Sequence, residues 1–210
     1  MDSFSLLIAV LLISSGYFFL GTKSSKGIRA TGAVLHSLPH HYGLFAGLLS
    51  ALPALVLLTI LGIGDGIVFD QLALEFVPDD VKASESYKEV IVLAQIYNVV
   101  NGINFGEQPD WVHAAAEAWN GWEATSTTLK TVTVLALSLI GGMLAYRMVN
   151  PDFRSRNAVE RIVMTILAAS SAIAILTTIG IVFSVIFESM RFFALVPVSE
   201  FLFGLKIINI

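Results

Sequence analysis

The stretch Arg156-Asn157-Ala158-Val159-Glu160-Arg161, followed by the apolar run 162–187, decides the fold class of this chain. The 26 residues of the run carry no charged side chain, and Glu188 and Arg191 close it. Because roughly 20 apolar residues cross a hydrocarbon core of ~30 Å as a helix, the run predicts a membrane span, and its extra length predicts some tilt.

Three further apolar segments precede this run, at residues 4–20, 44–63 (interrupted by Pro53) and 129–148. The composition agrees, since 56% of the 210 residues are hydrophobic and 13% are charged, against about a quarter charged in soluble domains. The chain has no cysteine, which excludes disulfides, thiolate metal sites and a cysteine nucleophile. We therefore predict an all-α integral membrane protein with four transmembrane helices and an external helical loop between the second and third spans.

The charges outside the spans predict an orientation. Asp2 precedes the first span and cations follow it, which is typical of a retained anchor rather than a cleaved signal peptide. Residues 22–43 carry three cations and no acid, and residues 147–161 carry four arginines against two acids. Residues 64–128 carry eleven acids against two lysines, a formal charge of −9. By the positive-inside rule both basic loops are cytoplasmic, and the acidic loop and both termini are external.

The acidic loop 64–128 has helical signals of its own. Turn chemistry at Pro78-Asp79-Asp80 predicts a helix that ends at Asn101-Gly102, and a second helix is expected to begin at Pro109-Asp110. The glycine-rich segment 62–66 predicts a flexible exit from the second span. In the second loop helix one face holds Trp111, Ala115, Trp119 and Trp122. Such a face predicts an aromatic belt at the bilayer surface; a carbohydrate- or partner-binding platform is the alternative.

Signals for chemistry are weak. His36, His40 and His41 are the one histidine cluster, but Pro39 interrupts a helix that would align them, so headgroup contact is favoured over zinc binding. Asp79 and Asp80 are interpreted as helix-start acids rather than an acid–base pair. The sequence has no Walker-type loop, HExxH or GxSxG motif. No catalytic, cofactor-binding or metal residue is therefore assigned, and the chain is not expected to be an enzyme.

The spans carry no ionisable residue in their central parts, whereas ion-coupled carriers usually do. Small residues instead recur at a spacing of four, which favours close helix packing: Ser138 with Gly142, Gly141 with Ala145, Ala168 with Ala172, and Gly180 with Ser184. These residues alone indicate a helix-packing subunit rather than a catalyst.

Several segments resemble PstC, the permease subunit of bacterial phosphate ABC transporters. The basic hexapeptide 156–161, Ile175-Leu176-Thr177-Thr178-Ile179-Gly180-Ile181-Val182, Phe187-Glu188-Ser189-Met190-Arg191-Phe192-Phe193 and the segment 196–206 look like the opening of that permease. Leu35-His36-Ser37-Leu38-Pro39-His40-His41-Tyr42-Gly43 with Ala51-Leu52-Pro53-Ala54-Leu55 is similar to an N-terminal extension that a subset of these permeases carries.

The resemblance implies phosphate import by a complex in the bacterial inner membrane. Its expected partners are a second permease (PstA-like), a separate ATPase (PstB-like) that hydrolyses ATP, and a periplasmic phosphate-binding protein. Residues 1–150 would then form a three-span extension with the acidic external loop, and residues 151–210 the start of the permease domain. The −9 loop would repel phosphate; it is expected to be a solvated surface, or else to face a lysine-rich surface of the binding protein.

The chain departs from the family after residue 206. The family sequence continues into Trp-Ser-Pro and further spans, whereas this chain ends Ile207-Ile208-Asn209-Ile210. We therefore expect the N-terminal portion of a permease, truncated or encoded separately, that does not transport phosphate alone. One alternative is a non-conducting four-span scaffold or regulatory subunit that associates with a transporter. An intramembrane enzyme would rest on the histidines alone.

Overall fold

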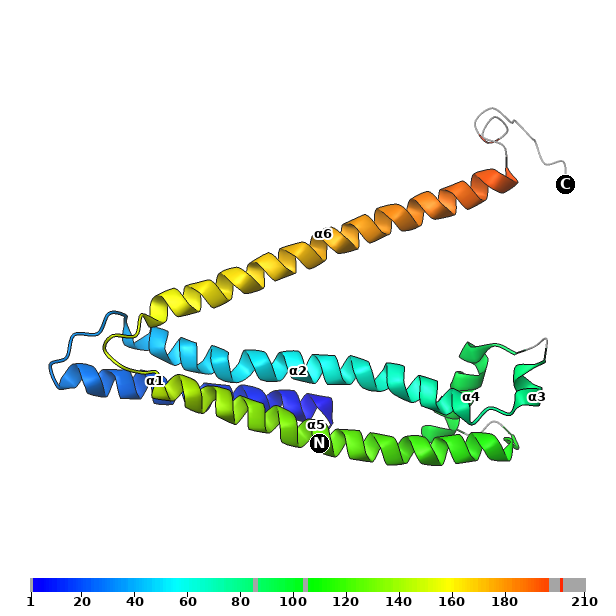
Figure 1. Ribbon diagram of the computed structural model, residues 1–210, viewed down its shortest axis with the longest axis horizontal. Helices are drawn as coiled ribbons and strands as arrows, with labels where there is room; N and C mark the ends of the chain where they lie inside the picture. Colours follow the sequence, from blue (N-terminus) through cyan, green and yellow to red (C-terminus); the bar gives the residue numbers. More distant parts are fainter. Residues whose placement is uncertain (1, 85–86, 104–105, 197–200, 202–210) are drawn as a thin grey trace. The chain divides into compact units, whose positions relative to one another are not determined.

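All of the described secondary structure is helical, as the sequence predicts. The computed structural model describes residues 2–84, 87–103, 106–196 and 201 (Figure 1). Its helices are α1 (Ser3–Ala30), α2 (Pro39–Glu75), α3 (Asp79–Lys82), α4 (Glu89–Val100), α5 (Asp110–Arg147) and α6 (Ser155–Leu195). Four of them, α1, α2, α5 and α6, are long and apolar enough to cross a membrane. The predicted four-span architecture is confirmed at this level.

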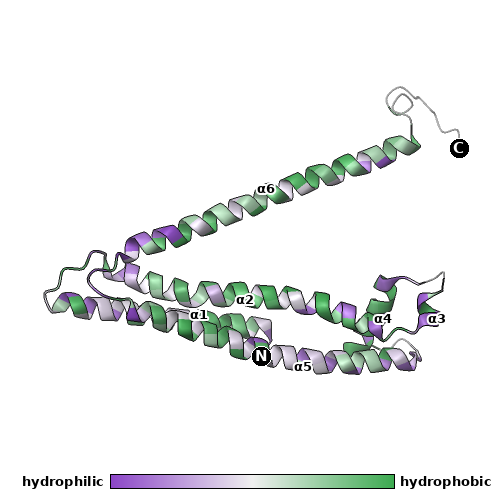
Figure 2. Ribbon diagram, viewed as in Figure 1, coloured by the Kyte–Doolittle hydropathy of each residue, from purple (hydrophilic) through white to green (hydrophobic). Residues whose placement is uncertain are grey.

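The chain divides into two compact units, Met1–Val159 and Glu160–Ile210. In the first unit α1 packs against α2 and α5, and these two helices pack against each other (Figure 1). Leu6 and Val10 of α1 contact Ala54 and Leu58 of α2 in a small apolar core. Figure 2 shows apolar residues along much of the bundle helices, with a more hydrophilic stretch midway along α5.

Glycines let the bundle helices approach each other closely. Gly43 of α2 lies against the backbone of Phe18 on α1, and Gly141 of α5 lies against the backbone carbonyl of Leu49 on α2. Without a hydrophobic driving force between helices in lipid, such contacts supply packing energy that larger side chains would prevent. The predicted role of Gly141 in helix packing is confirmed.

A serine from each helix lies buried at the centre of the bundle. The Ser50 hydroxyl donates to the Ser138 carbonyl oxygen at 2.9 Å and lies 3.0 Å from the Ser138 hydroxyl. Ser14 donates to the Val10 carbonyl at 2.7 Å and approaches the Ser50 hydroxyl at 3.3 Å. These bonds satisfy hydroxyl groups that would otherwise be costly to bury in an apolar environment.

Helix α2 continues well beyond the predicted end of the second span. The prediction of a flexible exit at residues 62–66 is wrong, because these residues lie inside the unbroken α2, as does Pro53. The helix continues because Phe69 and Ala73 are buried against α4 and α5. A cross-helix ion pair supports the same region, with Lys130 Nζ 2.6 Å from Asp65 Oδ2.

The predicted helix over 78–101 is two helices in the structure. Four-residue α3 begins at Asp79 and α4 begins at Glu89. The predicted ends are otherwise confirmed, since α4 stops before Asn101 and α5 begins at Asp110. Helix α5 then runs without a break from the loop into the third span.

The tryptophans of α5 pack against a protein core. Trp119 is 6% exposed in a core with Phe69, Val92, Ile96 and Val112, and Trp111 and Trp122 pack against that core. The expected aromatic belt is therefore wrong for Trp119. The helical spacing correctly placed these residues on one face, but α2 and α4 cover that face.

Helix α6 is longer than the predicted span 162–187, and its first turn belongs to the first unit. Within the described part of the second unit, no other long helix covers its apolar surface. The PstC-like segment 196–206 lies outside the described residues, apart from Val196 and Phe201.

Candidate functional site

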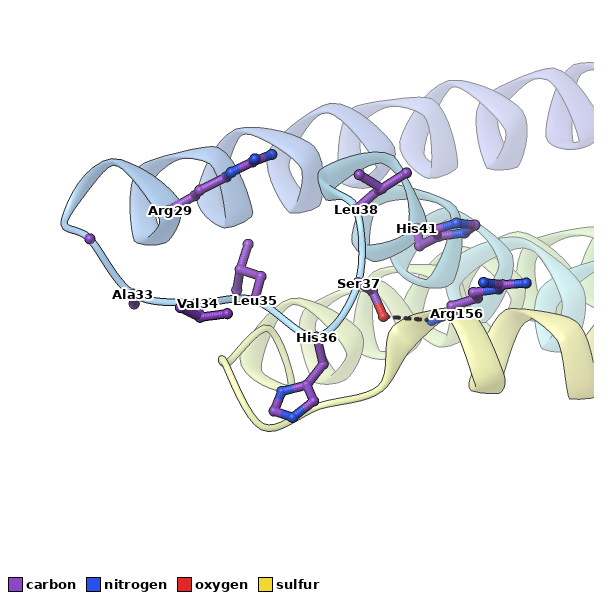
Figure 3. A pocket seen from close by; sticks show the side chains of 10 residues that line it. Arg29, Ala33, Val34, Leu35, His36, Ser37, Leu38, His41 and Arg156 are labelled. Carbon is purple, nitrogen blue, oxygen red and sulfur yellow. Dashed lines mark hydrogen bonds between the residues drawn. The ribbon is translucent and has the colours of Figure 1, made fainter.

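A cavity of about 530 Å³ lies at the end of the first unit where α1 ends and α2 and α6 begin (Figure 3). The loop between α1 and α2 forms much of its wall. The lining residues are Arg29, Gly32, Ala33, Val34, Leu35, His36, Ser37, Leu38, His41 and Arg156. Its volume lies within the range of about 300–1,000 Å³ that is usual for small-molecule sites.

The cavity is basic. Arg29, Arg156, His36 and His41 line it, and none of its lining residues is acidic. Among the described residues the one ion pair joins Lys130 to Asp65, so neither arginine is neutralised by a carboxylate in that part of the chain. Arg29 and Arg156 are both exposed, and their guanidinium groups remain accessible from solvent. The site therefore presents positive charge that the described protein does not compensate.

Hydrogen bonds between two loops fix the shape of the cavity. His36 Nδ1 lies 2.8 Å from the Pro151 carbonyl oxygen, and the Arg156 backbone N–H donates to the Ser37 hydroxyl at 3.2 Å. Beneath them the buried Tyr42 donates its O–H to the Phe153 carbonyl oxygen at 2.9 Å. These bonds connect the loop after α1 to the loop before α6. They hold Arg156 next to Ser37 in the wall of the cavity.

The histidines do not converge on a metal. The described residues contain no group of three histidine, aspartate or glutamate side chains placed to hold an ion. His36 is bonded to Pro151, while the rings of His40 and His41 lie 4.0 Å apart. The Nδ1 atom of His41 is buried and has no hydrogen-bond partner within the described chain. His41 thus lines the cavity with one ring nitrogen unpaired.

Asp79 and Asp80 occupy the first turn of the exposed helix α3, where their charge favours the helix N-terminus. Asp70 of α2 does engage α4, because its carboxylate accepts a hydrogen bond from the Tyr97 hydroxyl at 2.6 Å. Burial, together with the hydrogen bond to Asp70, raises the pKa of Tyr97 to about 12. Tyr97 also packs against Trp119 with ring centroids 4.8 Å apart. This arrangement stabilises the attachment of α4.

Sequence reasoning did not assign the cavity. It placed both basic loops on one side of the membrane but treated their charges as orientation signals. The one indication of an anion site in the sequence is that two basic loops are predicted on the same side of the membrane. One is acid-free and contains Arg29, and the other contains Arg156. Nothing in the spacing of residues so far apart in the chain predicts that they share a wall.

The chain matches a known protein family. The family described as "Phosphate ATP-binding cassette transporter" matches residues 6–177, which include the bundle, α4 and the first half of α6. No curated protein matches the chain. No solved structure matches it either.

Proposed function

Since the chain belongs to the phosphate ATP-binding cassette transporter family, we propose that it is a membrane-embedded permease component of a phosphate importer. The observation that carries this proposal is the combination of four span-length apolar helices with a family match that runs through them. The PstC-like segments support the assignment to this type of permease. ATP hydrolysis is assigned to a separate PstB-like subunit, and substrate delivery to a periplasmic phosphate-binding protein.

Helix α6 is the part proposed to join the transport core. It is apolar around its whole circumference over a span-length window, and a helix of that kind belongs in lipid or among other helices. Within the described part of its own unit it has no helical neighbour. We assign its partners to the PstA-like permease and to further permease helices. The proposed orientation in the bacterial inner membrane has the basic loops in the cytoplasm and both termini in the periplasm.

A second proposal is a non-conducting scaffold or regulatory subunit. It is favoured by the centre of the bundle, where Ser14, Ser50 and Ser138 bond to one another in a buried cluster. A pathway through this bundle would have to break these contacts. On either proposal the three-helix bundle is a support and does not itself conduct phosphate.

One experiment tests and separates the two proposals. The tagged chain is purified from its host membranes, and the co-purifying subunits are identified. ATP-driven phosphate uptake is then measured in proteoliposomes that contain those subunits with and without this chain. Uptake that requires the chain supports the permease component, and uptake that persists without it supports the scaffold. If no ATPase or permease co-purifies, both proposals are refuted.

A further inference from the structure

We propose that the cavity lined by Arg29, His41 and Arg156 is a binding site for a phosphate group, supplied by an anionic phospholipid headgroup or by free phosphate. The site lies in the first unit. Binding at this site can be tested without measuring transport.

The positive charge of the cavity favours an anionic ligand. Two arginines from different elements, α1 and the first turn of α6, line one cavity whose lining residues include no acid. A planar guanidinium presents paired N–H donors that match phosphate oxygens, and it stays charged at every physiological pH. His41 of α2 also lines the cavity, and its Nδ1 has no hydrogen-bond partner within the described chain. Two charged donors and an imidazole, from three helices, therefore line one space.

The N-termini of α2 and α6 add to the positive electrostatic potential in the cavity. Leu38, the residue before α2, and Arg156, in the first turn of α6, both line the cavity. The N-terminus of a helix carries a partial positive charge that favours an anion. The backbone N–H of Arg156 is itself used by Ser37, so the helix ends contribute field rather than the main contacts.

The apolar part of the cavity wall distinguishes a phospholipid headgroup from free phosphate as the bound ligand. Val34, Leu35 and Leu38 line the cavity beside the arginines, and the loop they belong to joins two span-length helices. Basic pockets at this level of a membrane protein suit phospholipid headgroups, with apolar neighbours for the glycerol and upper acyl carbons. Free phosphate would use the same arginines and leave the apolar wall unoccupied.

The test uses the full chain in nanodiscs. Native mass spectrometry counts phosphatidylglycerol retained from mixed phosphatidylcholine–phosphatidylglycerol discs, and equilibrium dialysis measures radiolabelled inorganic phosphate bound in phosphatidylcholine discs. We expect Arg29→Gln with Arg156→Gln to weaken binding by about tenfold or more, because a hydrogen bond to a charged group contributes at least about that factor. The matched control, Arg147→Gln with Arg154→Gln, removes two exposed cations outside the cavity and is expected to change binding less than about twofold.

The two arms identify the source. Retained phosphatidylglycerol without phosphate binding assigns the site to a lipid headgroup, and phosphate binding in phosphatidylcholine discs assigns it to the free ion. Absence of both overturns the proposal, as does an equal loss in the control pair, which would indicate general surface charge. Each single variant, Arg29→Gln and Arg156→Gln, is measured beside the double variant, and circular dichroism confirms that all are folded.

Discussion

Gly141 of α5 lies directly against the backbone carbonyl of Leu49 on α2, so a β-carbon at position 141 would occupy the space of that carbonyl. The neighbouring Gly142 has the same relation to the ring of Tyr17 on α1. Tyr17 donates its hydroxyl to the Leu139 carbonyl oxygen at 3.1 Å. Two adjacent glycines thus seat α5 against both of its partners in the bundle.

Replacing Gly141 by alanine should destabilise the bundle. The backbone of Leu49 cannot move aside as a flexible side chain can, and overpacking of this kind costs about 1–3 kcal/mol. The matched control is Gly121→Ala in the same helix, where an added β-carbon meets nothing within 4 Å. There the better helix propensity of alanine should add up to about 1 kcal/mol. Denaturant unfolding in micelles measures both; equal stability of the two variants would contradict the close approach.

The central serines should couple energetically. Ser50→Ala and Ser138→Ala each remove one hydroxyl from the pair 3.0 Å apart, and the interaction energy in a double-mutant cycle is expected to be about 0.6–1.7 kcal/mol, as for other interhelical hydrogen bonds in membranes. Ser15→Ala is the control, because Ser15 is exposed and bonds to Leu11 within its own helix. An interaction energy of zero between Ser50 and Ser138 would show that their contact contributes nothing beyond packing.

Tyr97 should ionise well above the usual value for tyrosine. Its pKa is raised to about 12 by burial and by Asp70, so folding favours the protonated phenol. This contribution to stability is fully present below about pH 10, the ordinary tyrosine pKa, and is lost as pH rises toward 12. The ultraviolet phenolate signal near pH 12 should disappear in Tyr97→Phe and move to lower pH in Asp70→Asn. An unchanged titration in Asp70→Asn would contradict the contact.

The proposed orientation can be read by cysteine labelling, because the chain has no cysteine of its own. Ala83→Cys lies in the exposed segment between α3 and α4, and Asp152→Cys lies in the exposed loop before α6. In cells whose outer membrane has been opened, a membrane-impermeant maleimide should label position 83 at once. Position 152 should react only after the inner membrane is permeabilised. The reverse pattern would invert the proposed topology.

Gly180 of α6 should matter for assembly rather than for the fold of the chain. An added β-carbon at Gly180 meets nothing within 4 Å, while the small residue Ser184 follows four positions later. Gly180→Leu is therefore expected to leave the isolated chain stable and to reduce co-purification with partner subunits severalfold. Val182→Leu, which replaces one branched apolar side chain by another, is the control. Equal recovery of partners with both variants would exclude Gly180 from the interface.

Hydrophobic length predicts the spans well because crossing a membrane requires an uninterrupted apolar stretch, and each of the four stretches falls on a helix to within one residue. What covers a face is harder to predict. The spacing placed Trp119 on the correct face of α5 but did not reveal that Phe69 would cover it, with ring centroids 5.4 Å apart. Periodicity identifies an apolar face, whereas its partner depends on tertiary contacts between distant segments.

The same limit explains the missed cavity and the missed continuity of α2. Arg29 and Arg156 were predicted to lie on one side of the membrane, but their common wall depends on the bonds of His36 to Pro151 and of Ser37 to Arg156. Glycines at 62–66 lower helix propensity locally. The ion pair of Asp65 with Lys130 and the burial of Phe69 outweigh that preference.

The uninterrupted α2 has a mechanical consequence. The N-terminal end of α1 contacts α2 near Leu58. From Leu58, α2 continues to Glu75, a rise of about 25 Å at 1.5 Å per residue. The first part of α5 is also unbroken and packs beside this part of α2. Neither helix is interrupted between α4 and the bundle. Because α4 contacts both α2 and α5, a force applied at α4 would be transmitted along these helices to the bundle that contains Ser14, Ser50 and Ser138.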